Sequence, residues 1–214
     1  MRWPRYATYE EDIDLRDEYW NTLFPVEKLW RIVMHDMTNV PLMKASVPEL
    51  QRATHNNYCM NYAKGGIHTQ PCGWEGTIEL YTGHIEDSAY VEKAKIFEDQ
   101  QEFAARDLVN GVLVPFINIF DKGYRLILQA AKAGNQKYLQ PYFAESDKRY
   151  GSHEVLFSAS VAATRSGNER SVRHMKHSWL IKRGASFQPF DFDLLADLWL
   201  AWGFQVNFMY DSVH

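Results

Sequence analysis

The sequence predicts a single α/β domain in which a mixed β-sheet is flanked by helices. Short runs rich in β-branched and aromatic residues end at turn residues, as buried strands do. The first runs follow one another closely, whereas the later ones are separated by stretches with a helical pattern. Because short turns join antiparallel strands and parallel strands need long crossovers, we expect antiparallel strands first and parallel strands later.

The first predicted strand covers residues 29–35, LWRIVMH, which have the length and apolar bias of a buried strand. It stops at Asp36, because the following residues Thr38, Asn39 and Pro41 disfavour a strand. We therefore expect Asp36 at the end of this strand.

Two more strands are predicted before the first long helix. They are GIHTQPCGW at residues 66–74 and TIELYTGHI at 77–85, and the pair Glu75 and Gly76 between them suits a hairpin turn. A helix is predicted over 88–110, where an imperfect helical pattern of apolar residues ends at an Asn-Gly pair.

The fourth strand is predicted at 112–120, VLVPFINIF, and it stops at Asp121. A second aspartate is therefore expected at a second strand end. A short helix at 124–133, a fifth strand at 137–140 and a helix at 156–180 follow. A last helix is indicated by apolar residues at helical spacing, which we interpret as facing the core: Leu194, Leu195, Leu198, Trp199 and Trp202.

This order is that of a ribonuclease H-like fold, with three antiparallel strands first, then parallel strands, and helices on the flanks. No internal repeat or Gly/Ser linker divides the chain, so residues 30–214 are expected to form one such domain. Residues 1–29 are aromatic and acidic. They fit either a leader that packs onto the domain or the truncated flank of a longer protein.

Composition bounds the class of protein. The 214 residues are 46% hydrophobic, enough to bury one sizeable core. The N-terminus lacks the features of a secretory signal, and the most apolar stretch, 194–210, is interrupted by polar residues, so we expect an intracellular chain without a membrane span. The two cysteines, Cys59 and Cys72, are expected to be buried free thiols, because two cysteines alone cannot complete a zinc site.

The charge is distributed unevenly along the chain. The net charge is −4, which argues against a uniformly basic nucleic-acid binder. Residues 145–183 nevertheless hold eight lysines and arginines against four acids. A bound polyanion is therefore expected to lie against this region.

Three carboxylates are candidates for a shared metal site. Asp36 and Asp121 end neighbouring strands, and Mg²⁺ is usually held by one or two carboxylates together with water and phosphate oxygens. Glu169 is the third candidate, because Arg165, Glu169, Arg173 and Lys176 form one stripe of the predicted helix and frame the carboxylate with cations. Bound metal ions lower the barrier for displacing one oxygen by another at phosphorus.

Each of these residues also has a purely structural interpretation. An aspartate at a strand end is often a turn residue, and Glu169 between two arginines fits ordinary i,i+4 pairing on a solvated helix. The spacing of the residues leaves both interpretations open.

Four stretches of the chain resemble the catalytic domain of Harbinger-type DDE transposases, the DDE superfamily endonucleases of eukaryotic mobile elements. They are DMTNVPLMKASVPELQRATHNNYCMNYAKGGIHTQPCGWEG, TGHIEDSAY, FINIFDKGYR and RSGNERSVRHMK, which begin at Asp36, Thr82, Phe116 and Arg165. The resemblance extends over about residues 30–210.

The resemblance implies roles for particular residues. The first catalytic aspartate of this family closes the first strand, as Asp36 is expected to do, and the second opens an aspartate-x-glycine-tyrosine motif, as Asp121 does. The family's late glutamate follows an arginine by four positions, as Glu169 follows Arg165. A glycine-x-x-x-aspartate element supplies Asp87, which the resemblance places near the site without making it a ligand.

The function implied is metal-dependent DNA cleavage and strand transfer in the nucleus. Two divalent ions, Mg²⁺ or Mn²⁺, would be held by Asp36, Asp121 and Glu169. The partners would be transposon ends and target DNA, together with a homo-oligomer or a separate DNA-binding protein. Candidate DNA contacts are Arg165, Arg170, Arg173, Lys176, Lys182 and Arg183.

Two alternatives stay open. Members of the family carry a DNA-binding segment ahead of the catalytic domain, and only about 35 residues precede Asp36 here. A fragment, or a decayed or domesticated copy, would be a non-catalytic DNA-binding or protein-interaction module with the same fold. An RNA-cleaving member of the same fold is the other alternative.

Overall fold

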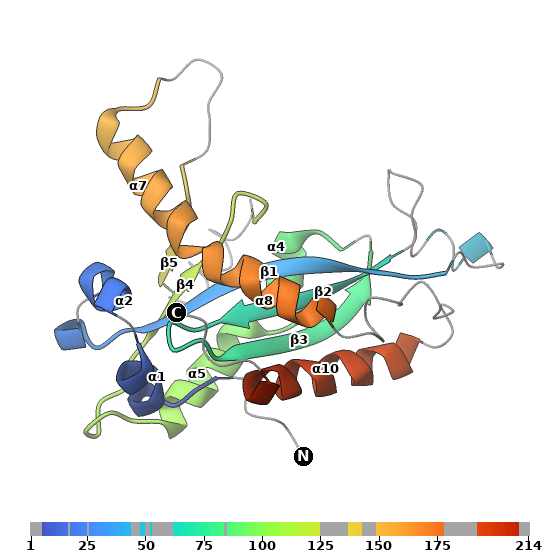
Figure 1. Cartoon of the computed structure of the whole chain (residues 1–214), viewed down its shortest axis with the longest axis horizontal. Coiled ribbons are helices and arrows are strands. Elements are labelled where there is room, and N and C mark those ends of the chain that lie inside the picture. The colour runs from blue at the N-terminus through green and yellow to red at the C-terminus, as the bar shows by residue number, and fades with distance from the viewer. Residues whose placement is uncertain are drawn as a thin grey trace.

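A five-stranded mixed sheet forms the centre of the molecule in the computed structural model (Figure 1). The structure describes residues 6–16, 18–24, 26–43, 48–49, 52, 62–83, 85–124, 137–142, 149–177 and 192–209. The strand order is β3-β2-β1-β4-β5, with β1 antiparallel to β2, β2 antiparallel to β3, and β4 and β5 parallel to β1. The strands are β1 (Arg31–Pro41), β2 (Tyr62–Thr69), β3 (Glu75–Thr82), β4 (Phe116–Ile119) and β5 (Lys137–Leu139). The predicted ribonuclease H-like arrangement is confirmed.

Helices cover both faces of this sheet because successive strand residues point to opposite sides. On one face, Ile32 and Met34 of β1 pack with Val161 and with the aromatic residues of the N-terminal segment. The opposite face carries Val33 and His35 of β1. The first face is covered by α8 (Ser166–His177) and α10 (Phe192–Met209), and the second by α4 (Asp87–Lys93) and α5 (Ile96–Arg106). α7 (Ser152–Thr164) extends away from the sheet and packs against it only near its C-terminal end, at Val161 (Figure 1).

β1 is longer than the sequence predicts, and this changes the position of Asp36. The predicted strand ends at His35, but β1 runs to Pro41 because its second half pairs with β2 along the whole register from Met34 to Pro41. Pairing with β4 stops earlier, at Met34. The expectation that Asp36 ends a strand is therefore wrong for β1 itself, although Asp36 does lie just beyond the parallel ladder.

The hairpin turn between β2 and β3 also differs from the prediction. Glu75 and Gly76 belong to β3 and not to a turn. The chain reverses one step earlier, where the amide of Gln70 donates to the carbonyl of Trp74 and Gly73 adopts a φ of 86°. Glycine accepts this left-handed conformation without a steric cost, which explains the position of the turn.

Both long helices predicted from the sequence are broken in two. The stretch 88–110 forms α4 and α5, because Lys95 between them has a φ of 51° and interrupts the helix. The stretch 156–180 forms α7 and α8, which meet at Arg165. The predicted helix at 124–133 lies outside the described residues, apart from Tyr124.

The last helix faces the core through Leu195 and Trp199, as its apolar spacing predicts, but Leu194, which the same prediction placed on the core face, is exposed. Leu195 and Trp199 of α10 are fully buried, and the indole nitrogen of Trp199 donates to the carbonyl of Ile78 at 2.8 Å. The helix lies close to β2 at Gly65, where an added Cβ would be 2.4 Å from the Trp199 ring. No described helix is long and apolar enough to cross a membrane.

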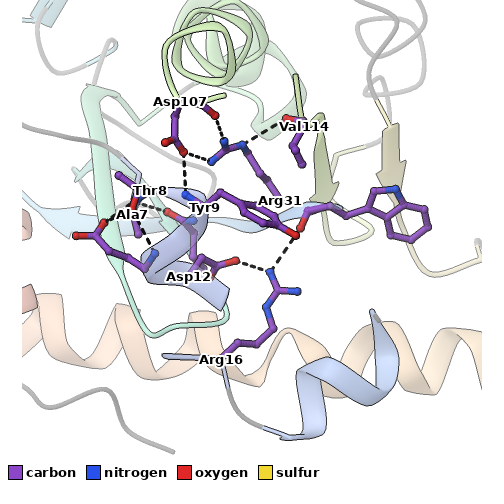
Figure 2. A network of polar contacts seen from close by, with 11 residues as sticks. Ala7, Thr8, Tyr9, Asp12, Arg16, Arg31, Asp107 and Val114 are labelled. Atoms are coloured by element: carbon purple, nitrogen blue, oxygen red, sulfur yellow. Dashed lines mark hydrogen bonds and ion pairs between the residues drawn. The ribbon is translucent and has the colours of Figure 1, made fainter. Parts of the chain in front are cut away.

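The described part of the N-terminal segment packs onto the domain. It contains α1 (Tyr9–Leu15), α2 (Glu18–Leu23) and a 3₁₀ turn, η1 (Val26–Lys28). Figure 2 shows the polar network that attaches it: the amide of Tyr9 donates to Asp107 at 2.8 Å, and Asp107 also pairs with buried Arg31 at 2.6 Å. Asp12, itself buried, accepts from Arg16.

Candidate functional site

Asp36 and Asp121 lie side by side at the end of the parallel ladder. The last paired residues of β1 and β4 are Met34 and Ile119, and each aspartate follows its strand's last pair by two positions. Side chains two positions apart point to the same face of a sheet, so both aspartates are directed toward the face that carries α7 and α8. The expectation that these two residues lie close together is confirmed by their shared contact with Arg165.

Arg165 lies between the two carboxylates. Its Nη2 atom is 3.9 Å from Oδ2 of Asp36 and 3.4 Å from Oδ2 of Asp121. The other oxygen of each aspartate is held by the backbone: Oδ1 of Asp36 accepts from the amide of Met37 at 2.8 Å, and Oδ1 of Asp121 accepts from the amide of Gly123 at 2.6 Å. Both Oδ2 atoms are therefore directed at one cationic group.

A third carboxylate, Asp87, approaches the same place from α4. An added Cβ on Gly123 would be 2.7 Å from Oδ2 of Asp87 and 2.8 Å from Oδ1 of Asp121, so both carboxylates border the space beside this glycine. Oδ1 of Asp87 pairs with Nζ of Lys64 at 2.9 Å. A side chain at position 123 would require both carboxylates to shift.

The electrostatics of the site follow from this crowding. Burial raises the pKa of Asp36, the Met37 amide and Arg165 lower it, and Asp121 and Asp87 raise it again. Tyr124 is fully buried, and burial followed by the three aspartates holds the pKa of its hydroxyl well above the usual value. Within the described residues this hydroxyl has no hydrogen-bond partner. A cation among these groups would relieve the repulsion between the carboxylates.

Glu169 is not brought to this cluster. It lies in the first turn of α8 and is exposed, whereas α8 buries Gly167, Asn168 and Ser171. Among the described residues, no group of three or more acidic, histidine or cysteine side chains gathers closely enough to hold a metal ion, so Glu169 does not join the two aspartates in one ligand set. The predicted stripe that joins Arg165 to Glu169 on one helix face is also absent, because Arg165 lies at the junction before α8 and turns toward the sheet.

The remaining candidate DNA contacts fall into two groups. Arg170, Arg173 and Lys176 are exposed on α8, on the outer surface of the layer that covers the aspartates. Lys182 and Arg183 lie outside the described residues. Arg165 is half-buried among the acids and does not share the exposed surface of the other three.

The donor set fits a divalent cation. Two carboxylate oxygens already converge on one positive group, and hard oxygens are the ligands that Mg²⁺ and Mn²⁺ prefer. Among the described residues, however, no group of three or more His, Cys, Asp or Glu side chains is close enough to hold an ion together. Asp36 and Asp121 would be the protein ligands, and a third carboxylate would have to move toward them.

A separate cavity of about 680 Å³ lies between the N-terminal helices, the β2–β3 turn, α8 and the end of α10. Neither Asp36 nor Asp121 lines it. Its polar wall includes Glu75, whose carboxylate binds Nδ1 of His174 at 2.8 Å. Cys72, which also lines it, is a buried free thiol as predicted, and Cys59 lies outside the described residues.

The sequence reasoning missed two features of the site. It predicted that Arg165 contacts DNA, whereas in the structure the guanidinium of Arg165 pairs with both aspartates. It placed Asp87 near the site only through the glycine-x-x-x-aspartate element, and the crowding at Gly123 shows how near the residue is to Asp121. The glycine in FINIFDKGYR was the one sequence signal of that close approach, because glycine lets neighbouring groups come closer than a larger residue does.

Comparisons with known proteins add little to the geometry. No protein-family model matches the sequence, and no curated protein matches it. Among solved structures, the crystal structure of the Mos1 strand transfer complex is similar at 15% identity and a TM-score of 0.27, over 95% of this chain. The chain spans 65% of the length of that chain. Likeness at this level shows neither family nor function, so the fold class rests on the sheet order.

Proposed function

We propose that this chain is the catalytic domain of a DDE-type DNA endonuclease and strand transferase, similar to that of Harbinger-type transposases. The observation that carries the proposal is the convergence of Asp36 and Asp121, from two different strands, on one cationic group. An aspartate pair of this kind on neighbouring strands provides the rigid part of a metal site for phosphoryl chemistry.

The chain's own residues have distinct tasks in the proposed reaction. Asp36 and Asp121 would hold the cations, while the amides of Met37 and Gly123 fix one oxygen of each aspartate and so orient both carboxylates. Bound divalent cations supply activation of the attacking oxygen and stabilisation of the leaving oxygen at phosphorus. The reaction class is hydrolysis of a DNA strand, followed by attack of the freed 3′-hydroxyl on target DNA.

Glu169 is proposed as the third acidic ligand on the strength of the family pattern alone. It lies next to Asn168, which is buried toward the sheet with both amide atoms lacking partners within the described residues. Successive residues of a helix lie about 100° apart around its axis, so bringing Glu169 to the position of Asn168 would require α8 to rotate by about that angle. The exposed Arg170, Arg173 and Lys176 are proposed to hold the DNA backbone beside it, because phosphates are bound by arginine and lysine without regard to sequence.

Nicking of supercoiled DNA by the purified full chain tests the proposal. We expect Mg²⁺- or Mn²⁺-dependent nicking, and we expect Asp121→Asn to lower its rate at least about a hundredfold, because the amide loses the charge that binds the cation. Filter binding or electrophoretic mobility should show that the variant still binds DNA.

The matched control is Asp193→Asn, the same change at an exposed position on α10, which should nick at the wild-type rate. Unaltered nicking by Asp121→Asn would contradict the proposed site. An RNA–DNA hybrid offered beside duplex DNA separates the DNA endonuclease from an RNA-cleaving enzyme of the same fold.

A non-catalytic DNA-binding or protein-interaction module is the second candidate. It is favoured by the pairing of both aspartates with Arg165, which partly neutralises them without a metal, and by the exposure of Glu169, which leaves the pair without a third acidic ligand. Metal-independent DNA binding combined with no nicking in either Mg²⁺ or Mn²⁺ would support this candidate over the enzyme.

A further inference from the structure

We propose that Arg165 is an internal counter-cation: it holds Asp36 and Asp121 together in the metal-free protein and leaves them when a divalent ion binds. The inference rests on the proposed function, because it concerns the same two carboxylates. It assigns Arg165 a role in controlling metal entry in place of the role of a permanent DNA contact.

Arg165 lies where the two carboxylates would bind a metal ion. Arg165 Nη2 lies within ion-pair distance of the Oδ2 atoms of both Asp36 and Asp121, which are the oxygens that the backbone leaves free. A divalent ion bound by the same two atoms would occupy the space that the guanidinium now occupies. Two cations cannot share it, so their binding is mutually exclusive.

The ion pairs of Arg165 with Asp36 and Asp121 are weak. At 3.9 and 3.4 Å the two pairs are longer than charge-assisted hydrogen bonds, and the three side chains are 22% to 32% exposed. Ion pairs of this kind contribute little free energy because water competes for both partners. Arg165 Nε is buried and has no partner within the described part of the chain. The guanidinium is therefore held loosely.

The backbone of Arg165 is fixed at the junction between α7 and α8, whereas its side chain is free to rotate. The amide of Arg165 donates to the carbonyl of Val161, and the carbonyl of Arg165 accepts from the amide of Asn168, so α7 and α8 fix the Cα atom. The long side chain can leave the carboxylates by rotation about its own bonds.

Metal binding and the release of Arg165 are thermodynamically linked. Because Arg165 and the divalent ion exclude each other, metal binding frees a guanidinium for the DNA backbone, and an anion that binds Arg165 favours metal binding to the same degree. The carboxylates are never left as an unscreened acidic cluster. This matters because Asp87 lies beside them and the three negative charges would repel one another.

Mn²⁺ affinity of the full chain tests the inference. The protein is stripped with a chelator, and free Mn²⁺ is then counted by electron paramagnetic resonance for the wild type, Arg165→Gln and Asp121→Asn. We expect Arg165→Gln to bind Mn²⁺ on the order of tenfold more tightly than the wild type, because two competing ion pairs are lost. Asp121→Asn should bind much more weakly than either.

Arg106→Gln is the matched control, because it removes the same charge and an exposed ion pair with Glu102 far from the aspartates. Its Mn²⁺ affinity should equal that of the wild type within about twofold. Equal or weaker Mn²⁺ binding by Arg165→Gln, beside a clear loss in Asp121→Asn, would overturn the inference and leave the proposed function standing. Absence of Mn²⁺ binding in all variants would overturn both.

A measurement on the wild type covers the case in which Arg165→Gln does not fold. Saturating Mn²⁺ should speed modification of the Arg165 guanidinium by phenylglyoxal, followed by mass spectrometry of the peptide, because the side chain leaves the carboxylates while the backbone of the junction stays in place. Unchanged or slower modification of Arg165, with Mn²⁺ bound, would contradict displacement of the arginine.

Discussion

At the scale of single residues, β1 carries opposite chemistry on its two sides. Asp36 faces the helices that cover the candidate metal site, whereas its neighbour His35 is fully buried on the other face. Nε2 of His35 lies 2.7 Å from Oδ1 of Asn118, which also accepts from Gln100 at 2.6 Å, so His35 donates and stays neutral. Burial lowers the pKa of His35 to about 4.

This pKa predicts a specific loss of stability in acid. In the unfolded chain the imidazole binds its proton near its ordinary pKa of 6.5, whereas the folded chain resists protonation down to about 4. The free energy of unfolding should therefore hold its value above pH 6.5 and fall by up to about 3 kcal/mol as the pH is lowered toward 4. Urea unfolding in the presence of a chelator, repeated between pH 7.5 and about 4.5, measures this fall in the free energy of unfolding.

His35→Gln supplies the control, because glutamine retains a hydrogen-bond donor and does not titrate. Its unfolding free energy should fall less steeply over the same pH interval. A pH dependence equal to that of the wild type would show that His35 does not carry the effect.

At the scale of elements, α8 and α10 pack closely against the sheet at positions occupied by glycine. α10 approaches β2 at Gly65 and β3 at Gly203, where an added Cβ would be 2.2 Å from the Thr77 side chain. α8 approaches β1 at Gly167, where the nearest atom is the flexible end of Met34 at 3.2 Å. These contacts set how close α8 and α10 lie to the sheet.

Gly65→Ala should therefore be costly. The new methyl group would overlap the Trp199 ring and Leu80, and overpacking of this kind destabilises a protein by about 1–3 kcal/mol. Gly167→Ala is the matched comparison: Met34 can move aside and alanine favours a helix, so its unfolding free energy should be close to that of the wild type. Urea denaturation of both variants decides the point, and equal stabilities would contradict the described seating of α10.

At the scale of the whole molecule, the buried guanidinium of Arg31 is one of the contacts that join the N-terminal segment to the sheet. Arg31 at the start of β1 is 1% exposed, pairs with Asp107 and donates to the carbonyl of Val114 at 3.3 Å. It also lies over the rings of Tyr9 and Phe103. The segment from Tyr6 to Arg16 therefore shares its anchor with the ends of α5 and β4 (Figure 2).

Arg31→Met should lower the free energy of unfolding by about 3 kcal/mol, because Asp107 and the Val114 carbonyl lose their partner in a buried setting. Arg106→Met, which breaks an exposed pair, should cost less than about 1 kcal/mol. Limited proteolysis should also cut the Arg31→Met variant sooner within residues 6–16. Similar losses in the two variants would show that the anchor adds nothing to the fold.

The sequence by itself determined the order of the elements. Apolar runs of strand length, the helical spacing around Trp199 and the turn residues after each run are local properties, so they predicted the ribonuclease H-like sheet and brought Asp36 and Asp121 to one edge of it. The motif around Asp121 also predicted its backbone turn, since Gly123 is the residue that admits two neighbouring acids.

Only the tertiary structure decided where β1 ends, where the long helices break and which charged residues form ion pairs. Asp36 stays within a strand because β2 pairs beyond it, and Arg165 reaches the aspartates because α7 ends one residue before it. Both outcomes depend on partners distant in the chain. A periodic pattern reports which face a residue occupies on its own element, but the contacts of that face are set by packing against other elements.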